Sequence, residues 1–227
     1  MIVLVKLFIF GIVLTLAGCS SPAPVAREAA PVKADEPAVA AAPDNRKVFL
    51  VFGDSISAGY GLAPGLSYPD VMQRAIDAQK LRWRVVNQGV SGDTTAGGAA
   101  RIQAAVELKP SLVLLELGGN DGLRGLPLTS TRENLEKMIL EFRAAGAEVV
   151  LAGMTLPPNY GPDYIKRFEQ VFIELAAKHR LKLIPFLLSD IITQDLRYFQ
   201  QDGIHPTEQG AEIVAATAMK TLQPLLK

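Results

Sequence analysis

From residue 47 onward, short apolar runs alternate with segments whose apolar positions recur at helical spacing. The runs are rich in Val, Leu, Ile or Phe, and each is followed by glycine, proline or polar residues, as buried strands are. They lie at residues 48–52, 83–87, 112–117, 149–153 and 183–186. The segments between and after them predict helices at residues 68–79, 95–108, 131–145, 164–179 and 206–222. This alternation predicts a three-layer α/β domain with a five-stranded parallel sheet between helices.

The N-terminal residues have the pattern of a signal peptide. Lys6 precedes an uninterrupted apolar run at residues 7–17, which is too short to span a bilayer permanently, and Gly18 and Cys19 follow. The sequence LAGC at residues 16–19 resembles the lipobox of bacterial lipoproteins, which implies cleavage after residue 18 and lipidation of the Cys19 thiol. The alternative is a conventional signal peptide with an incidental cysteine. Cys19 is the only cysteine, so an intramolecular disulfide is excluded.

Residues 19–46 are expected to form a tether between the lipidated Cys19 and a domain at residues 47–227. The segment is dominated by alanine and proline, with no large apolar side chain to bury, so it is predicted to stay extended. Ser20 directly after the cysteine resembles the outer-membrane sorting pattern of enteric-type bacteria. We therefore expect a protein of the bacterial cell envelope that is anchored in the outer membrane and faces the periplasm.

The overall charge argues against nucleic acid as a partner. Lysine and arginine number 23 and aspartate and glutamate also number 23, so the formal net charge is +0. Binding to a phosphate backbone requires a basic excess that this chain lacks. The sequence shows no repeat and no second domain, and we expect a monomer.

Three polar motifs follow the first three predicted strands. GDS occupies residues 53–55, VSGDT residues 90–94 and GGND residues 118–121. Ligands of open parallel sheets bind at the carboxyl ends of the strands, where such loops converge. The three motifs are therefore expected to meet at one edge of the sheet.

Two histidines are candidates for a general base. His179, in AKHR at the end of a predicted helix, is expected to be structural. His205 lies in DGIHP, and Asp202 stands three residues before it, close enough on a turn to orient one imidazole nitrogen and leave the other free for a proton. Taken alone, this segment could equally be a turn that starts a helix.

A serine at another strand end is the matching nucleophile. Ser55 closes GDS after the first strand, although by itself it could be only a helix N-cap. Acyl transfer also needs donors for the developing oxyanion, and the Ser55 amide, Gly92 and Asn120 can supply them. Asn120 and Gly92 could each be simple turn residues. Asp54 and Asp121 are interpreted as turn stabilisers outside the catalytic set.

These motifs together resemble the SGNH (GDSL-type) hydrolases, and most closely the bacterial arylesterase, lysophospholipase and thioesterase I group. The blocks occur in order as GDS, the glycine block at Gly92, GGND and DGIHP, and LELGGNDGLRG and PPNYGPDY also look like that group. The resemblance implies a flavodoxin-like SGNH fold, a catalytic triad of Ser55, Asp202 and His205, and an oxyanion hole of Ser55, Gly92 and Asn120. Ile56 stands where the family name has leucine.

The resemblance implies hydrolysis of small acyl or aryl esters, lysophospholipids or acyl thioesters through an acyl-enzyme on Ser55. It also points to residues 123–129 and 159–164 as pocket-lining loops. The sequence contains no motif for a metal or a nucleotide phosphate, so no cofactor is expected. Two alternatives stay open at this stage: a carbohydrate O-deacetylase of the same fold, and a non-catalytic binding lipoprotein of the envelope.

Overall fold

The five expected strands form one sheet in which all neighbouring strands are parallel. The computed structural model describes residues 44–192 and 196–227, and its folded unit covers Asp44–Lys227. The strand order is β2-β1-β3-β4-β5. The strands are β1 (Lys47–Gly53), β2 (Trp83–Gly89), β3 (Leu112–Glu116), β4 (Glu148–Ala152) and β5 (Lys182–Ile184). The predicted sheet is confirmed, and all three polar motifs leave it at its carboxyl edge.

The interiors of the central strands are apolar because both of their faces are covered. Along β1, Leu50 and Phe52 pack into the hydrophobic core on one side of the sheet, and Phe49 and Val51 pack into the core on the other side. All four side chains are fully buried. Such continuous apolar runs are typical of strands in a sheet that carries helices on both faces.

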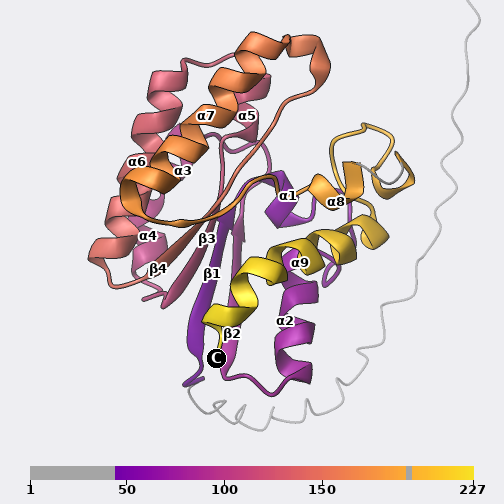
Figure 1. Cartoon of the computed structure of the whole chain (residues 1–227). Helices are drawn as coiled ribbons and strands as arrows, with labels where there is room; N and C mark the ends of the chain where they lie inside the picture. The colour runs from indigo at the N-terminus through magenta and orange to yellow at the C-terminus, as the bar shows by residue number, and fades with distance from the viewer. Residues whose placement is uncertain (1–43, 193–195) are drawn as a thin grey trace, which may run out of the picture. The chain divides into compact units, whose positions relative to one another are not determined.

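Helices cover both faces of the sheet (Figure 1). On one face α2 packs against α9, and on the other α6 packs against both α3 and α7. The longer helices are α2 (Tyr68–Ala78), α6 (Leu128–Ala144), α7 (Pro162–His179) and α9 (Glu208–Leu222). The shorter ones are α1 (Ser55–Ala58), α3 (Thr95–Ala100), α4 (Ile102–Val106), α5 (Gly119–Leu123) and α8 (Ser189–Ile192). Three 3₁₀ turns are η1 (Pro158–Tyr160), η2 (Leu196–Tyr198) and η3 (Gln223–Leu225).

The helix expected at residues 95–108 is in fact two helices, α3 and α4, separated at Arg101. The backbone of Arg101 has φ −102° and ψ 9°, which is outside the helical range. The short helices α1, α5 and α8 were not expected, because segments of four or five residues carry too little periodicity to detect.

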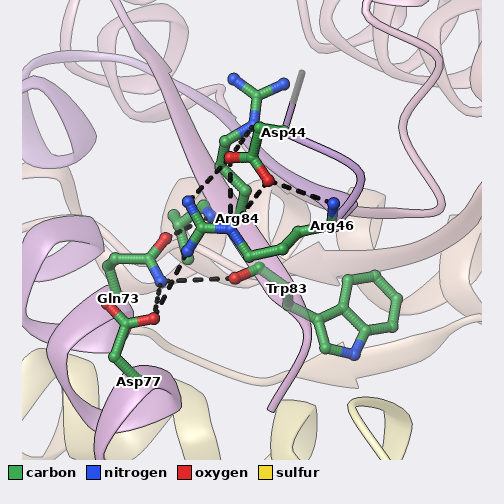
Figure 2. Close-up of polar contacts among 7 residues, drawn as sticks. Asp44, Arg46, Gln73, Asp77, Trp83 and Arg84 are labelled. Atoms are coloured by element: carbon green, nitrogen blue, oxygen red, sulfur yellow. Dashed lines mark hydrogen bonds and ion pairs between the residues drawn. The ribbon is translucent and has the colours of Figure 1, made fainter. Parts of the chain in front are cut away.

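Polar contacts secure the start of the folded unit on α2 and β2 (Figure 2). Arg46 pairs with Asp44 at 2.8 Å and with Asp77 of α2 at 3.4 Å, and Arg84 of β2 lies 3.5 Å from Asp44. Asp44 and Arg46, which the sequence assigned to the tether, are therefore part of the folded unit. Residues 1–43, with Cys19 and the predicted signal peptide, lie outside the described residues. Among the helices that the structure describes, none is long and apolar enough to cross a membrane.

Candidate active site

Ser55 lies at the carboxyl end of the central strand β1, as the first residue of α1. The preceding Asp54 caps this helix, because its carboxylate accepts a hydrogen bond from the Ile56 N–H at 3.0 Å. The turn is closed by a hydrogen bond from Ala58 N to the Asp54 carbonyl at 2.9 Å. A strand that passes directly into a capped helical turn fixes the backbone on both sides of Ser55 and points its hydroxyl out of the sheet edge.

His205 and Asp202 complete a continuous chain of hydrogen bonds to this serine. His205 Nε2 lies 2.8 Å from Ser55 Oγ, and His205 Nδ1 lies 2.6 Å from Asp202 Oδ2. The other oxygen of Asp202 accepts the backbone N–H groups of Ile204 and His205 at 2.9 and 3.0 Å. The structure thus brings the three residues of the expected triad together in the order that proton transfer requires.

Asp202 is held in its charged form. Burial acts to raise the pKa of this carboxyl, but the backbone N–H and imidazole of His205 and the N–H of Ile204 outweigh it and lower the pKa from 3.8 to about 2. A carboxylate beside Nδ1 favours the tautomer that carries its proton there. Nε2 is then free to accept the proton of Ser55.

Tyr60 is a neighbour of His205 that the sequence did not reveal. The centroids of the two rings are 4.6 Å apart, with their planes at 40°. An aromatic ring in this position limits the rotation of the imidazole and interacts favourably with it when it is protonated. No sequence signal marks Tyr60, because it follows α1 in a glycine-rich turn and resembles a loop residue.

Two of the three expected oxyanion donors are unoccupied backbone amides. Among the described residues, neither the Ser55 N–H nor the Gly92 N–H donates a hydrogen bond to the protein. Gly92 has a φ of +79°, which only glycine adopts without strain, and both residues line the same cavity. Free N–H groups in that position can stabilise a negative oxygen beside Ser55.

Asn120 also lines the cavity, but its amide already has partners. Nδ2 donates to the Asp93 carbonyl at 2.9 Å and to Asp54 Oδ2 at 3.2 Å. The first bond fixes the amide plane, and the second occupies the hydrogen that an oxyanion would take. Asp54 therefore contacts a candidate catalytic group in addition to capping α1.

Behind the serine lies a buried pair of carboxyl groups. Glu116, at the end of β3, has no exposed surface and accepts hydrogen bonds from Ser57 Oγ at 2.5 Å and from Asp54 N at 3.3 Å. Burial, together with the charge of Asp54, raises the pKa of Glu116 well above its usual range. Burial also raises the pKa of Asp54 to about 6. Glu116 is therefore a neutral acid that holds the backbone next to Ser55.

A cavity of about 520 Å³ opens beside the triad. It combines Ser55, Gly92, Asn120 and His205 with side chains that are mainly apolar. The apolar lining comes from Tyr60, Leu123, Met154, Leu156, Pro157, Pro158, Phe186, Leu188, Ile192, Leu196, Phe199 and Ile204. A site with few polar groups and a long apolar wall fits a hydrocarbon chain or an aromatic ring better than a sugar.

The two predicted pocket loops lie at the cavity only in part. Leu123 lines it, and Tyr160 supports Leu123 from behind through a hydrogen bond from its hydroxyl to the Leu123 carbonyl at 2.7 Å. The residues after β4, from Met154 to Pro158, line it directly. Their place after a strand was the signal that could have identified them, since the same argument located the polar motifs.

The remaining predicted residues take structural positions. His179 ends α7, where Nε2 lies 2.6 Å from Glu136 of α6. Asp121 accepts hydrogen bonds from Thr95 N at 2.8 Å and Thr131 Oγ1 at 3.3 Å, so it ties α5 to α3 and α6 as well as stabilising a local turn. Among the described residues, no group of three or more His, Cys, Asp or Glu side chains could hold a metal ion.

Comparison with known proteins assigns the chain to a family. Residues 51–213 match the GDSL-like Lipase/Acylhydrolase family. The chain belongs to this family. It is 43% identical over 182 residues to Esterase TesA of Pseudomonas aeruginosa, an alignment that covers 79% of this chain and 90% of the relative. It is 37% identical over 178 residues to the Thioesterase 1/protease 1/lysophospholipase L1 of Escherichia coli, with 78% and 84% covered.

The GDSL-like fold is also shared with solved structures. The psychrotrophic esterase EstA from Pseudoalteromonas sp., in a structure inhibited by monoethylphosphonate, matches with a TM-score of 0.75 and 31% identity, covering 79% of this chain and 98% of that one. These similarities place the chain among the esterases, thioesterases and lysophospholipases of the SGNH family.

Proposed function

We propose that this GDSL-family hydrolase cleaves esters and thioesters of apolar acyl groups through a covalent acyl-enzyme on Ser55. The observation that carries the proposal is the continuous hydrogen-bond chain from Asp202 through His205 to Ser55, which ends in an apolar cavity. A hydroxyl alone is a weak nucleophile, and an imidazole within hydrogen-bond distance, oriented by a carboxylate, activates it.

In the first half of the reaction, Ser55 Oγ attacks the substrate carbonyl carbon while His205 Nε2 takes the hydroxyl proton. The carbonyl oxygen becomes an oxyanion next to the free N–H groups of Ser55 and Gly92, and Asn120 joins them when its Nδ2 turns from Asp54 to the substrate. The C–O or C–S bond then breaks, and His205 gives its proton to the leaving alcohol or thiol. The acyl group stays on Ser55.

In the second half, water replaces the leaving group and the same residues act in reverse. His205 accepts a proton from the water that attacks the acyl carbon, and the Ser55 oxygen then leaves with that proton. The products are the free acid and the regenerated serine. Asp202 stays ionised throughout, consistent with its low pKa.

The apolar lining supports single acyl chains or aryl groups as the acyl part, and lysophospholipids and acyl thioesters as natural substrate classes. The Pseudomonas aeruginosa relative is named an esterase, and the Escherichia coli relative is named a thioesterase and lysophospholipase. A carbohydrate O-deacetylase would instead need polar side chains along the wall to pair with sugar hydroxyls. The described cavity offers few of them.

A second part of the proposal concerns location. The LAGC sequence supports lipidation at Cys19, and Ser20 supports sorting to the outer membrane, where the domain would act in the periplasm as a monomer. An envelope location favours ester and lysophospholipid substrates over acyl-CoA, which is made and used in the cytoplasm.

Labelling with a fluorophosphonate tests the catalytic proposal, because the serine oxygen displaces fluoride and remains bound to phosphorus. The native protein is expected to be labelled at Ser55, Ser55→Ala not at all, and His205→Ala much more slowly. His179→Ala is the matched control and should react like the native protein, since its imidazole pairs with Glu136. Labelling of Ser55→Ala at the native rate would contradict the assignment, and an unlabelled, inactive native protein would favour a binding lipoprotein.

A panel of p-nitrophenyl esters and acetylated sugars separates the two enzyme functions. Longer acyl chains are expected to be hydrolysed with a higher kcat/KM than acetyl esters because they fill the apolar cavity. Faster cleavage of the acetylated sugars would favour the deacetylase.

A further inference from the structure

One arginine connects the two segments that carry the Ser55 and Gly92 donors. Arg101 Nε donates to Asp93 Oδ2 at 2.8 Å, and a terminal nitrogen of the same guanidinium donates to the Gly53 carbonyl at 3.0 Å. The guanidinium carbon lies 3.9 Å from the centre of the Phe52 ring. The charged group is thus held over a buried aromatic ring between two loops.

Each of these contacts is one or two residues from a candidate oxyanion donor. Gly53 lies two residues before Ser55, and Asp93 follows Gly92 directly. The Asp93 carbonyl also accepts the hydrogen bond from Asn120 Nδ2 at 2.9 Å. Arg101 therefore joins the Ser55 turn to the Gly92 turn, and it contacts Asp93, the residue whose carbonyl holds the Asn120 amide.

The surroundings leave Arg101 and Asp93 few other arrangements. Their side chains are only 23% and 10% exposed, so breaking the pair would leave a carboxylate largely cut off from water. An added Cβ at Gly97 would collide with Asp93 Oδ1, which shows how closely this carboxylate packs on the first turn of α3. Arg101 lies at the interruption between α3 and α4, where its backbone departs from helical geometry.

We propose that Arg101 is a positioning residue that sets the geometry of the oxyanion hole by joining the Ser55 and Gly92 turns through Gly53 and Asp93. The inference rests on the proposed function, because it assigns a purpose to the donors of that site. It requires the guanidinium, which donates to the two oxygens from two different nitrogens. A lysine carries all its donors on a single nitrogen and cannot reproduce both donor positions above the Phe52 ring. An oxyanion hole that is 1 Å wider loses most of its effect on the transition state.

The first test compares Arg101→Lys and Arg101→Gln with the native protein on an aryl ester. Both variants are expected to lose roughly 10–100-fold in kcat with KM within about twofold, because a displaced donor affects the transition state more than the bound ester. Circular dichroism verifies folding. Should Arg101→Gln not fold, the result for the more conservative Arg101→Lys decides the test. Arg143→Gln is the matched control, since its guanidinium contacts the His179 carbonyl instead of the site. Native kcat in folded Arg101→Lys would overturn the proposal.

A double variant tests whether Arg101 acts through the oxyanion donors. If it does, the loss of kcat in the double variant Arg101→Lys/Asn120→Ala should be at least about tenfold smaller than the product of the losses in the two single variants. The effects of residues that act as a unit are not additive. A loss equal to the product would show that Arg101 has only a general structural role. Fluorophosphonate labelling of Ser55 in the native protein tests the proposed function independently. A negative result for the Arg101 variants would therefore not contradict the assignment of the triad.

Discussion

The carboxylate of Asp54 accepts a hydrogen bond from the Asn120 amide at 3.2 Å, on the wall of the cavity that contains Ser55. The amide has a second, shorter bond of 2.9 Å to the Asp93 carbonyl. The bond to Asp93 therefore keeps the side chain in place while the bond to Asp54 exchanges for one to the substrate. An oxyanion carries a full charge and accepts this hydrogen better than the ester carbonyl does, which makes the exchange specific to the transition state.

Asn120→Ala is expected to lower kcat by roughly 10²–10³ with little change in KM, as is typical when one oxyanion donor is removed. The measurement is steady-state hydrolysis of an aryl ester by folded protein. Asn45→Ala removes an exposed asparagine outside the site and should keep the native kcat. A native kcat in Asn120→Ala would reduce Asn120 to a residue that only shapes its turn.

Asp54→Asn is expected to change how stability depends on pH. The pKa of Asp54 is 3.8 in its unperturbed state and is raised by burial to about 6 in the folded protein. As pH rises through this interval the unfolded chain loses the proton first, so Asp54 progressively lowers the free energy of unfolding. Asparagine does not titrate, so the variant should gain stability relative to the native protein as pH increases.

Urea denaturation of both proteins at about pH 4 and about pH 7 measures this difference. Asp77→Asn, at an exposed position of α2, is the control and should show a much smaller pH-dependent change. A difference between Asp54→Asn and the native protein that is the same at both pH values would show that Asp54 ionises in the folded protein as it does in the unfolded chain.

Leu196→Ser is expected to reduce kcat/KM for octanoyl esters by about 3–10-fold and to leave acetyl esters unaffected, because only the longer chain can cover this side chain. Leu196 lines the cavity but is 77% exposed, so the substitution should not disturb the core. Leu140→Ser alters another exposed leucine, on α6, and should leave the hydrolysis of both esters unchanged. Equal loss on both esters would place the acyl chain elsewhere in the cavity.

Cys19→Ser is expected to release the protein from the membrane fraction with its esterase activity intact, since all acyl chains of a lipoprotein anchor attach at this residue. Cell fractionation with an immunoblot measures the distribution, and Ser21→Ala is the control that should remain in the membrane fraction. Retention of Cys19→Ser in membranes would contradict lipidation at this position.

Much of the architecture was predictable because the sheet has two covered faces. Residues 48–52 of β1 and 112–115 of β3 are apolar without a break, and this pattern cannot belong to a half-exposed strand. The polar motifs could be assigned to one edge for a related reason, since parallel strands place all their carboxyl ends together. The pairing of Ser55 with His205 followed from chemistry, because only two histidines were available.

The interior of the site was less predictable. Apolar residues such as Met154 and Leu156 have the same appearance in the sequence whether they fill a core or line a cavity, and only the fold separates the two. The interruption of the helix at Arg101 was also not predicted from the sequence. The local pattern is helical, and the side-chain contacts of Arg101 are with Asp93 and Gly53, outside the helix. Tyr60 is positioned by the fold against a histidine far along the chain.

Both ends of the folded unit lie at the amino-terminal edge of the sheet, and the catalytic serine lies at the opposite, carboxyl edge. Lys47 begins β1 and is paired in register with Trp83, whose indole Nε1 donates to the Leu226 carbonyl at 2.9 Å. The length of β1, about 20 Å, separates them from the Ser55 turn. A surface, a purification tag or a partner domain can therefore be joined to either end without covering the mouth of the cavity, which suits this enzyme to immobilisation and to fusion in both orders.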